Sequence, residues 1–343
     1  MKLMEKIQAG VYTIAEMSAN HAGSLDNALA IVGAAKSAGA DCLKTQTYTA
    51  DTLTLHSDRA CFTIQDGPWA GETLYDLYKR AYTPWEWQAE IKAECDRLGI
   101  DFLSSPFDVT AVDFLEEIGV GAYKIASFEL VDIPLIRYVA GKGKPVIIST
   151  GMGSIDEIGE AVEACRAQGN DKIVLLKCTS EYPAQFDDMN LRTIEDMQWR
   201  FGVPIGLSDH SPGSTAAVAA VALGACVIEK HFCLSREIEN ADSAFSMEPA
   251  EFAQMVTGVN DAYAARGSDN YECTPKEAAS KKLRRSLFVA RDIAKGSVIA
   301  DGDVRSVRPA DGLPPKHLGR VTGMRASRDL QFGEPLDWDM LED

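Results

Sequence analysis

The sequence predicts a (β/α)₈ TIM barrel followed by a small, mostly β C-terminal domain, and three observations support this α/β architecture. From residue 12 to about residue 265, short β-branched runs alternate with longer stretches of helical periodicity. Eight such units in about 250 residues match a barrel in number and length. All eight strand runs end in polar side chains, although strands inside a ring of helices are buried on both faces. A doubly wound open sheet is the alternative, and the lack of a G-x-G-x-x-G fingerprint disfavours it.

The predicted strands follow one another at regular intervals. They span residues 13–19, 41–47, 101–106, 121–127, 145–150, 172–179, 204–210 and 226–232. Helical stretches follow them, for example at 24–38, 84–98, 154–167 and 249–264. Ser24, Ser154 and Ser214 are predicted N-caps, and Pro84 suits a first helical turn. The longest irregular insertion, at about 48–83, is expected to form a long loop over one barrel face.

The sequence changes character after the last predicted helix. We expect a barrel domain at 1–268, a polar linker at 269–284 that is partly helical from Pro275, and a small domain at 285–343. Within the small domain, strand or turn elements are predicted at 286–296, 304–307 and 333–336.

The composition argues against several classes of partner and favours a reducing compartment. With 51 acidic and 34 basic residues the chain has a formal charge of −17, which argues against nucleic acid or an anionic membrane as a partner. The eight cysteines form no C-x-x-C pair, so a disulfide scaffold and a structural zinc site are disfavoured. No signal-peptide pattern and no apolar run of about 18 residues is present. We therefore expect a cytoplasmic protein with reduced thiols.

Two histidines end the seventh and eighth strand runs. His210 and His231 are 21 residues apart, at equivalent points of consecutive repeats. If these strands are parallel neighbours, the imidazoles face each other at one barrel mouth and can bind a divalent metal. The alternative is a hydrogen-bonded pair of core histidines. Two ligands leave positions open for substrate oxygens, and the pattern does not choose among Mn²⁺, Mg²⁺, Zn²⁺ and Co²⁺.

Two lysines lie inside apolar strand runs, where an unpaired ammonium is costly to bury. Lys44 and Lys124 are therefore predicted to bind a phosphate or carboxylate ligand. The alternative is a salt bridge to a strand-end glutamate such as Glu16 or Glu129. Serine hydroxyls near the strand ends can donate to the same anion: Ser105, Ser127, Ser180 and Ser208. Glu16 and Glu129 are also candidates for general acid or base work, or for holding sugar hydroxyls.

Several of these segments, in this order, resemble the sialic acid synthase family. The segments are 14–24, 43–47, 104–107, 123–129, 149–152, 206–210 and 229–232. The resemblance covers nearly the whole chain, and residues 286–343 look like the family's antifreeze-like SAF domain, a β-clip. Within the family, residues 69–87 and 242–247 look most like the branch that forms pseudaminic acid.

This resemblance implies a transferase that condenses phosphoenolpyruvate with an open-chain amino sugar and water, releasing phosphate. For the pseudaminic branch, the acceptor would be 2,4-diacetamido-2,4,6-trideoxy-altrose. It also implies Mn²⁺ or Mg²⁺ on His210 and His231, polarising the sugar aldehyde. The sister branches that make N-acetylneuraminate or legionaminate are alternatives. A metal-dependent pyruvate aldolase and a non-catalytic sugar-binding protein are more distant ones.

The resemblance also assigns individual residues. Phosphoenolpyruvate would be held by Lys44, Lys124, Ser105, Ser127 and Ser208. The sugar would lie near Glu16, Gln46, Tyr182 and Asp242, and Glu129 would handle the water proton. Ser180 stands where the neuraminate-making members carry asparagine. The resemblance further implies a domain-swapped homodimer, in which Arg308 reaches across to the sugar in the partner's barrel.

Overall fold

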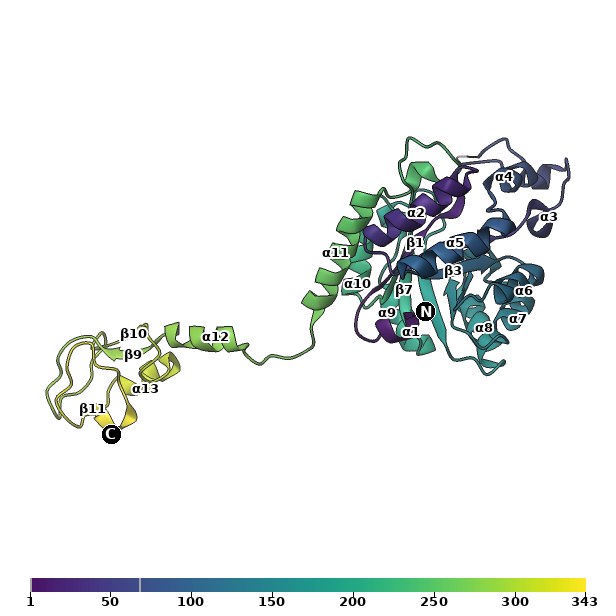
Figure 1. Ribbon diagram of the computed structural model, residues 1–343. Coiled ribbons are helices and arrows are strands. Elements are labelled where there is room, and N and C mark those ends of the chain that lie inside the picture. The colour runs from purple at the N-terminus through teal and green to yellow at the C-terminus, as the bar shows by residue number, and fades with distance from the viewer. Residues whose placement is uncertain (1, 68) are drawn as a thin grey trace. The chain divides into compact units, whose positions relative to one another are not determined.

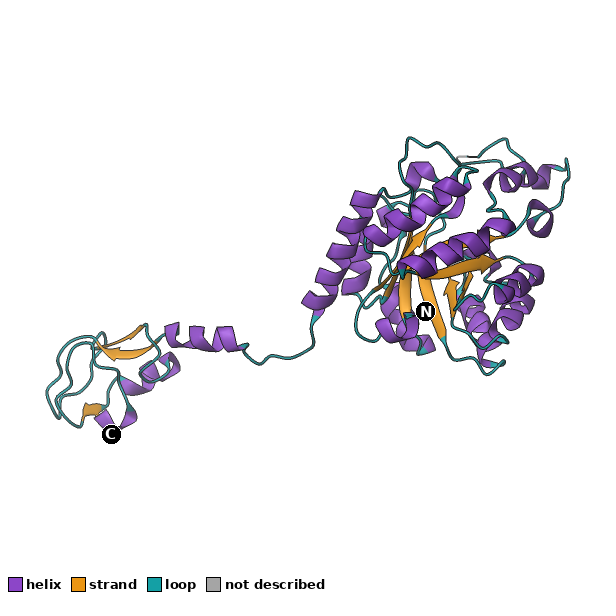
Figure 2. Ribbon diagram, in the orientation of Figure 1, coloured by secondary structure: helices purple, strands orange, loops and turns teal. Residues whose placement is uncertain are grey.

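The computed structural model describes residues 2–67 and 69–343 and divides the chain into two compact units, Met1–Gly267 and Ser268–Asp343. In the first unit, eight parallel strands pair in chain order and close into a barrel. Helices surround these strands, as Figures 1 and 2 show. The predicted eight-stranded barrel is confirmed.

The barrel strands lie close to the predicted runs. They are β1 Tyr12–Glu16, β2 Cys42–Thr47, β3 Asp101–Pro106, β4 Tyr123–Ile125, β5 Val146–Ser149, β6 Ile173–Cys178, β7 Ile205–Asp209 and β8 Val227–His231. Two of them, β1 and β4, end more than one residue earlier than predicted. The chain turns into a 3₁₀ helix at Ser18–His21 after β1, where Ser18 has a φ of 44°, and into another at Ser127–Glu129 after β4. These turns bring the polar residues after the strands back over the barrel mouth.

The helices of the first unit fill the intervals between strands. They are α1 Leu3–Lys6, α2 Leu25–Ser37, α3 Ala50–Leu53, α4 Leu74–Ala81, α5 Trp85–Leu98, α6 Val109–Glu117, α7 Ile133–Ala140, α8 Ile155–Arg166, α9 Thr193–Phe201, α10 Thr215–Ala222 and α11 Pro249–Arg266. Ser24 and Ser154 cap α2 and α8 through their side chains, as predicted. Ser214 precedes α10 but makes no capping bond, and Pro84 lies at the N-cap position of α5 rather than in its first turn.

The interior of the barrel changes from apolar to polar along its axis. Inward residues such as Tyr12, Leu103 and Leu176 form one buried apolar cluster, and Leu3 of α1 packs into it. A second, larger cluster joins the outer faces of the strands to the helices. The charged residues Glu16, Lys44, Lys124 and Glu229 are buried between the middle of their strands and the C-terminal ends, so the site opens at that mouth.

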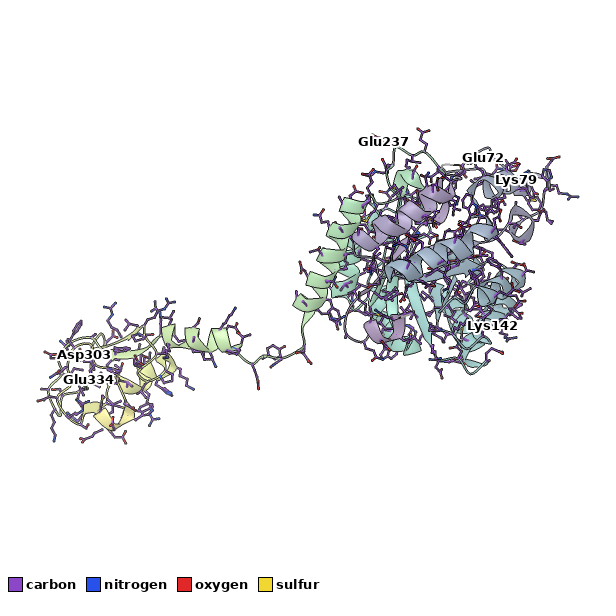
Figure 3. The ribbon with its side chains drawn as sticks, viewed as in Figure 1. Glu72, Lys79, Lys142, Glu237, Asp303 and Glu334 are labelled. Atoms are coloured by element: carbon purple, nitrogen blue, oxygen red, sulfur yellow. The ribbon has the colours of Figure 1, made fainter. Side chains whose placement is uncertain are left out.

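The insertion after β2 is more ordered than the predicted loop, because it contains α3 and α4. Trp69, within it, donates from Nε1 to the Ala241 carbonyl at 3.3 Å, in the loop that follows β8. In Figure 3, Glu72 and Lys79 of the insertion and Glu237 of the β8 loop lie at one end of the barrel, away from Lys142. The two loops therefore meet over the barrel mouth.

The second unit has a small β core. It contains α12 Pro275–Ser280, β9 Ser286–Val289, β10 Val304–Val307, α13 Leu318–Val321, β11 Arg325–Ala326 and β12 Leu341–Glu342. The strands pair antiparallel, β9 with β10 and β11 with β12. Its core consists of 11 buried apolar residues around Leu287 and Leu336. Residues 268–343 contain 13 Lys and Arg and 13 Asp and Glu, so the net charge of the chain falls on the barrel unit.

The helices give no sign of a membrane span. Across residues 2–67 and 69–343, none is long and apolar enough to cross a bilayer.

Candidate active site

Two histidines meet at the C-terminal end of the barrel. His231 is the last residue of β8, and His210 directly follows β7. Asp209 and Lys230 are partners in the β7–β8 register, so each histidine lies one residue beyond a paired position. The imidazole centroids are 5.4 Å apart, with the rings inclined by 56°. The structure thus brings together the two histidines that the sequence placed at neighbouring strand ends.

A backbone hydrogen bond sets the orientation of His210. Its Nδ1 atom lies 3.0 Å from the Thr179 carbonyl oxygen. Because a carbonyl only accepts, Nδ1 carries a hydrogen and Nε2 is the nitrogen left to bind a proton or a metal. Burial lowers the pKa of His210, but the hydrogen bond to Cys178 and the Thr179 carbonyl raise it, and the net shift is upward. The ring is therefore held in the same orientation in either protonation state.

His231 is a neutral imidazole. Burial lowers its pKa well below the usual value, and the charges of His210 and nearby lysines lower it further. Its Nδ1 atom is buried and has no hydrogen-bond partner among the described residues. A neutral imidazole with a free nitrogen is a common ligand of divalent cations, so the pair fits one. No group of three potential ligands from His, Cys, Asp and Glu occurs in residues 2–67 and 69–343, so other ligands would come from substrate or water.

Two lysines and two glutamates form a buried charge cluster below the histidines. Lys44 Nζ lies 2.6 Å from Glu16 and 3.7 Å from Glu229, and Lys124 Nζ lies 3.4 Å from Glu229. Ser208 also donates to Glu229, at 3.2 Å. The predicted alternative of a salt bridge is thus present for Lys44 and Glu16. Lys124 pairs instead with Glu229, a residue that was not predicted to have a role.

The net pKa shifts of the two lysines have opposite directions. Burial lowers the pKa of both ammonium groups, but for Lys44 the two carboxylates outweigh it and the pKa rises. For Lys124 burial prevails and the pKa falls. Burial also raises the pKa of Glu16, against the pull of Lys44. The cluster contains as many acids as bases, so Lys124, the less strongly compensated cation, is the better placed to receive another anion.

Hydroxyl groups from three strand ends converge beside this cluster. Ser127 accepts a hydrogen bond from the Gly151 amide at 3.1 Å, and Ser105 lies 3.5 Å from Lys44 Nζ. A Cβ atom at Gly151 would lie 2.2 Å from Ser180 Oγ and 2.7 Å from Ser127 Oγ. A larger residue at this position would therefore displace the hydroxyl groups. The sequence placed the serines here but gave no role to Gly151.

The loops after β1 and β8 meet on the other side of the mouth. Gln46 donates to Glu16 at 2.9 Å and to Ser18 at 3.1 Å. Asp242 is buried and accepts from the Ala19 amide at 2.9 Å, and burial raises the pKa of this carboxyl. These contacts join Gln46 to Glu16 and, through Asp242, join the loop after β8 to the 3₁₀ turn after β1.

Aromatic side chains cover the histidines. The Tyr182 ring lies 4.3 Å from that of His210 and 6.1 Å from that of His231. Phe245 lies 5.1 Å from both Tyr182 and His231, and Trp69 of the insertion lies 6.1 Å from Tyr182. The sequence did not single out Phe245, because an aromatic residue in a loop carries no periodic signal.

Glu129 lies at the end of the 3₁₀ turn after β4. Burial raises its pKa to about 7, although its backbone hydrogen bond and Lys124 oppose the shift. Its Oε2 atom is buried without a hydrogen-bond partner in the part of the chain that the structure describes. A carboxyl group with this pKa can exchange a proton near neutral pH.

Arg308 belongs to the second unit. Its side chain is exposed and lines a surface hollow with Arg284 and Arg285. The expected contact of Arg308 with the sugar in the barrel of a partner subunit therefore stays a prediction.

Comparisons with known proteins match both units. Residues 31–271 match the model of the NeuB family, and residues 284–342 match that of the SAF domain. The chain is 45% identical to pseudaminic acid synthase of Campylobacter jejuni subsp. jejuni, over 95% of each protein. It is 36% identical to N,N'-diacetyllegionaminic acid synthase of Legionella pneumophila, over 96% of this chain and 94% of the relative. A crystal structure of N-acetylneuraminic acid synthetase from Leptospira borgpetersenii, in complex with citrate, has a TM-score of 0.71 at 32% identity and covers 79% of this chain and 90% of its own.

Proposed function

The chain belongs to the NeuB family, and from that premise we propose that it is a transferase condensing phosphoenolpyruvate with 2,4-diacetamido-2,4,6-trideoxy-altrose and water. The products are pseudaminic acid and phosphate. The observation that carries this assignment is the 45% identity to a pseudaminic acid synthase over 95% of both chains. The polar cluster at the barrel mouth supplies the groups that this chemistry needs.

Phosphoenolpyruvate is assigned to the lysine side of the mouth. Lys44 and Lys124 provide buried positive charge in a barrel that is otherwise strongly acidic. Their ammonium groups can bind phosphate or carboxylate oxygens as point charges. Hydroxyl groups that can donate to the same oxygens are those of Ser105, Ser127, Ser180 and Ser208.

The sugar is assigned to the opposite side. Glu16, Gln46 and Asp242 offer carboxylate and amide groups to its hydroxyl and acetamido groups, and Tyr182 offers an aromatic face. His210 and His231 would hold Mn²⁺ or Mg²⁺, which when bound supplies Lewis-acid polarisation of the aldehyde oxygen. In the proposed homodimer, Arg308 of one copy contacts the sugar in the barrel of the other.

The reaction forms one C–C bond and one C–O bond to the oxygen of water, and it cleaves the C–O bond to the phosphate oxygen. The methylene carbon of phosphoenolpyruvate bonds to the aldehyde carbon, and the aldehyde oxygen takes up a proton. Water adds to the former enol carbon, the bond from that carbon to the phosphate oxygen breaks, and a ketone remains. We assign to Glu129 the proton that water loses, and the support for this role is that burial raises the pKa of its carboxyl group to about 7.

A panel of acceptors tests the assignment. Purified enzyme with phosphoenolpyruvate and Mn²⁺ is expected to release phosphate with the altrose derivative, and to stop when a chelator removes the metal. Release with N-acetylmannosamine or the legionaminic precursor, but not with the altrose derivative, would assign the chain to a sister branch. Condensation from pyruvate, without phosphoenolpyruvate, would instead indicate an aldolase.

A further inference from the structure

A buried ion pair lies directly behind the two histidines. Lys230 Nζ is 2.7 Å from Asp209 Oδ2, and the two side chains are 1% and 0% exposed. Asp209 precedes His210, and Lys230 precedes His231. The ion pair therefore joins the two strands that carry the histidines, one residue before each of them.

The pair faces away from the proposed substrates. Side chains alternate along a strand, so Lys230 points to the side opposite Glu229 and His231. Glu229 contacts Lys44 and Lys124 at the centre of the mouth. Lys230 instead donates to the carbonyls of Ser211 at 2.5 Å and Gly213 at 3.0 Å, in the segment leading to α10. It is therefore unlike the two lysines assigned to phosphoenolpyruvate.

Together the two residues fix the chain on both sides of His210. The ammonium of Lys230 uses its three hydrogens on Asp209, Ser211 and Gly213. Asp209 Oδ1 accepts from the amide of Ser211 at 2.9 Å and from its hydroxyl at 2.7 Å. The residues before and after His210 are thus bound to one another, and both are bound to the residue that precedes His231.

Stability alone does not account for this arrangement. A buried ion pair recovers little more than its desolvation cost, and an apolar pair of similar volume often serves stability as well. Metal-binding histidines, by contrast, need support that fixes their orientation. We propose that Lys230 and Asp209 are positioning residues, which set the spacing of His210 and His231 for a divalent cation. This inference rests on the metal site of the proposed function.

The test measures binding of Mn²⁺ to the full chain without substrates, from the electron paramagnetic resonance signal of free Mn²⁺. The double variant Lys230→Met/Asp209→Leu replaces the ion pair with apolar side chains. We expect it to bind Mn²⁺ about tenfold or more weakly, the usual effect of losing an outer-shell contact. Its metal-free unfolding midpoint should also fall, because the Ser211 amide and the carbonyls of Ser211 and Gly213 lose their partners. Lys230→Arg, which keeps the charge and several donors, should recover part of the affinity.

Two further variants separate positioning from folding. Val162→Ala lies in the core on α8, which carries none of the proposed site residues, and should lower the unfolding midpoint without changing the affinity for Mn²⁺. Asp209→Asn keeps the side-chain shape and provides a milder test if the double variant does not fold. We expect it to weaken Mn²⁺ binding several-fold.

Wild-type affinity in the variants that alter the ion pair would overturn the inference, provided that His210→Ala abolishes binding. If the wild type itself bound no divalent cation, the metal site of the proposed function would fail as well. The two failures are therefore distinguishable.

Discussion

The two halves of the barrel interior bury different kinds of side chain, one apolar and the other charged. The apolar half is a packed cluster that includes Tyr12, Leu103 and Leu176. The polar half buries Glu16, Lys44 and other charged groups, which lose hydration, and ion pairs offset only part of that cost. The apolar half therefore stabilises the fold, whereas the polar half buries charged groups at an energetic cost because the proposed reaction needs them. Substitutions in the two halves should therefore have separable effects.

The largest expected effect belongs to the histidines. His231→Ala should reduce phosphate release by at least about 10³-fold, because Lewis-acid polarisation is worth several kcal/mol in the transition state. Circular dichroism should show a folded protein, since the Nδ1 atom of His231 has no hydrogen-bond partner within residues 2–67 and 69–343. A variant that turned over at a tenth of the wild-type rate would show that His231 is not essential to the reaction.

Leu176→Ala tests the apolar half. Removing this fully buried side chain should lower the free energy of unfolding by about 3 kcal/mol. The KM for phosphoenolpyruvate should stay within about twofold of the wild type, because Leu176 belongs to the apolar cluster. Chemical denaturation and initial-rate kinetics measure the two quantities. A large rise in KM with little loss of stability would contradict the division between the halves.

Lys124→Met is the matched test in the polar half. We expect the KM for phosphoenolpyruvate to rise about 10-fold to 100-fold, since one charge-assisted contact is worth about 1.5–3 kcal/mol. The stability loss should be smaller than for Leu176→Ala, because burial already lowers the pKa of Lys124 and Glu229 keeps Lys44 nearby. Unchanged KM would remove Lys124 from the proposed phosphoenolpyruvate site.

Glu129→Gln tests the coupling of stability to pH. Burial raises the pKa of Glu129 to about 7 in the folded state, above its value in the unfolded chain. The folded protein therefore loses stability as pH rises from the unfolded pKa to about 7, by about 3 kcal/mol in total. The glutamine variant should lack this loss, so its advantage in unfolding midpoint should grow between pH 5 and pH 7 and then level off. The rate should also lose its dependence on a group titrating near pH 7.

Trp69→Phe is expected to have the smallest effect. The substitution removes the hydrogen bond to Ala241, which is worth about 1 kcal/mol, and keeps an aromatic ring near Tyr182. The KM for the sugar should rise a few-fold, while the KM for phosphoenolpyruvate should not change. Equal effects on both substrates would argue against a role confined to the sugar side.

The sequence predicted the barrel and its mouth because both depend on periodicity. Strand runs that end in polar residues located Lys44, Lys124, His210 and His231 on one side of the fold. Other features depend on loop paths or on strand register, which periodicity does not determine. Three features of the site could not be predicted for this reason. They are the pairing of Lys124 with Glu229, the close approach of Gly151 to two serines, and the position of Phe245.

The uneven division of charge between the two units has a kinetic consequence. Because residues 268–343 are balanced, the formal charge of −17 surrounds the barrel, and an anionic substrate approaches against a repulsive field. Lys44 and Lys124 are buried and partly neutralised, so their attraction is felt only at short range. At physiological ionic strength the screening length is about 8 Å, and added salt weakens the distant repulsion more than the local attraction. Moderate salt should therefore speed the capture of phosphoenolpyruvate, whereas most enzymes that steer a charged substrate inward are slowed by it.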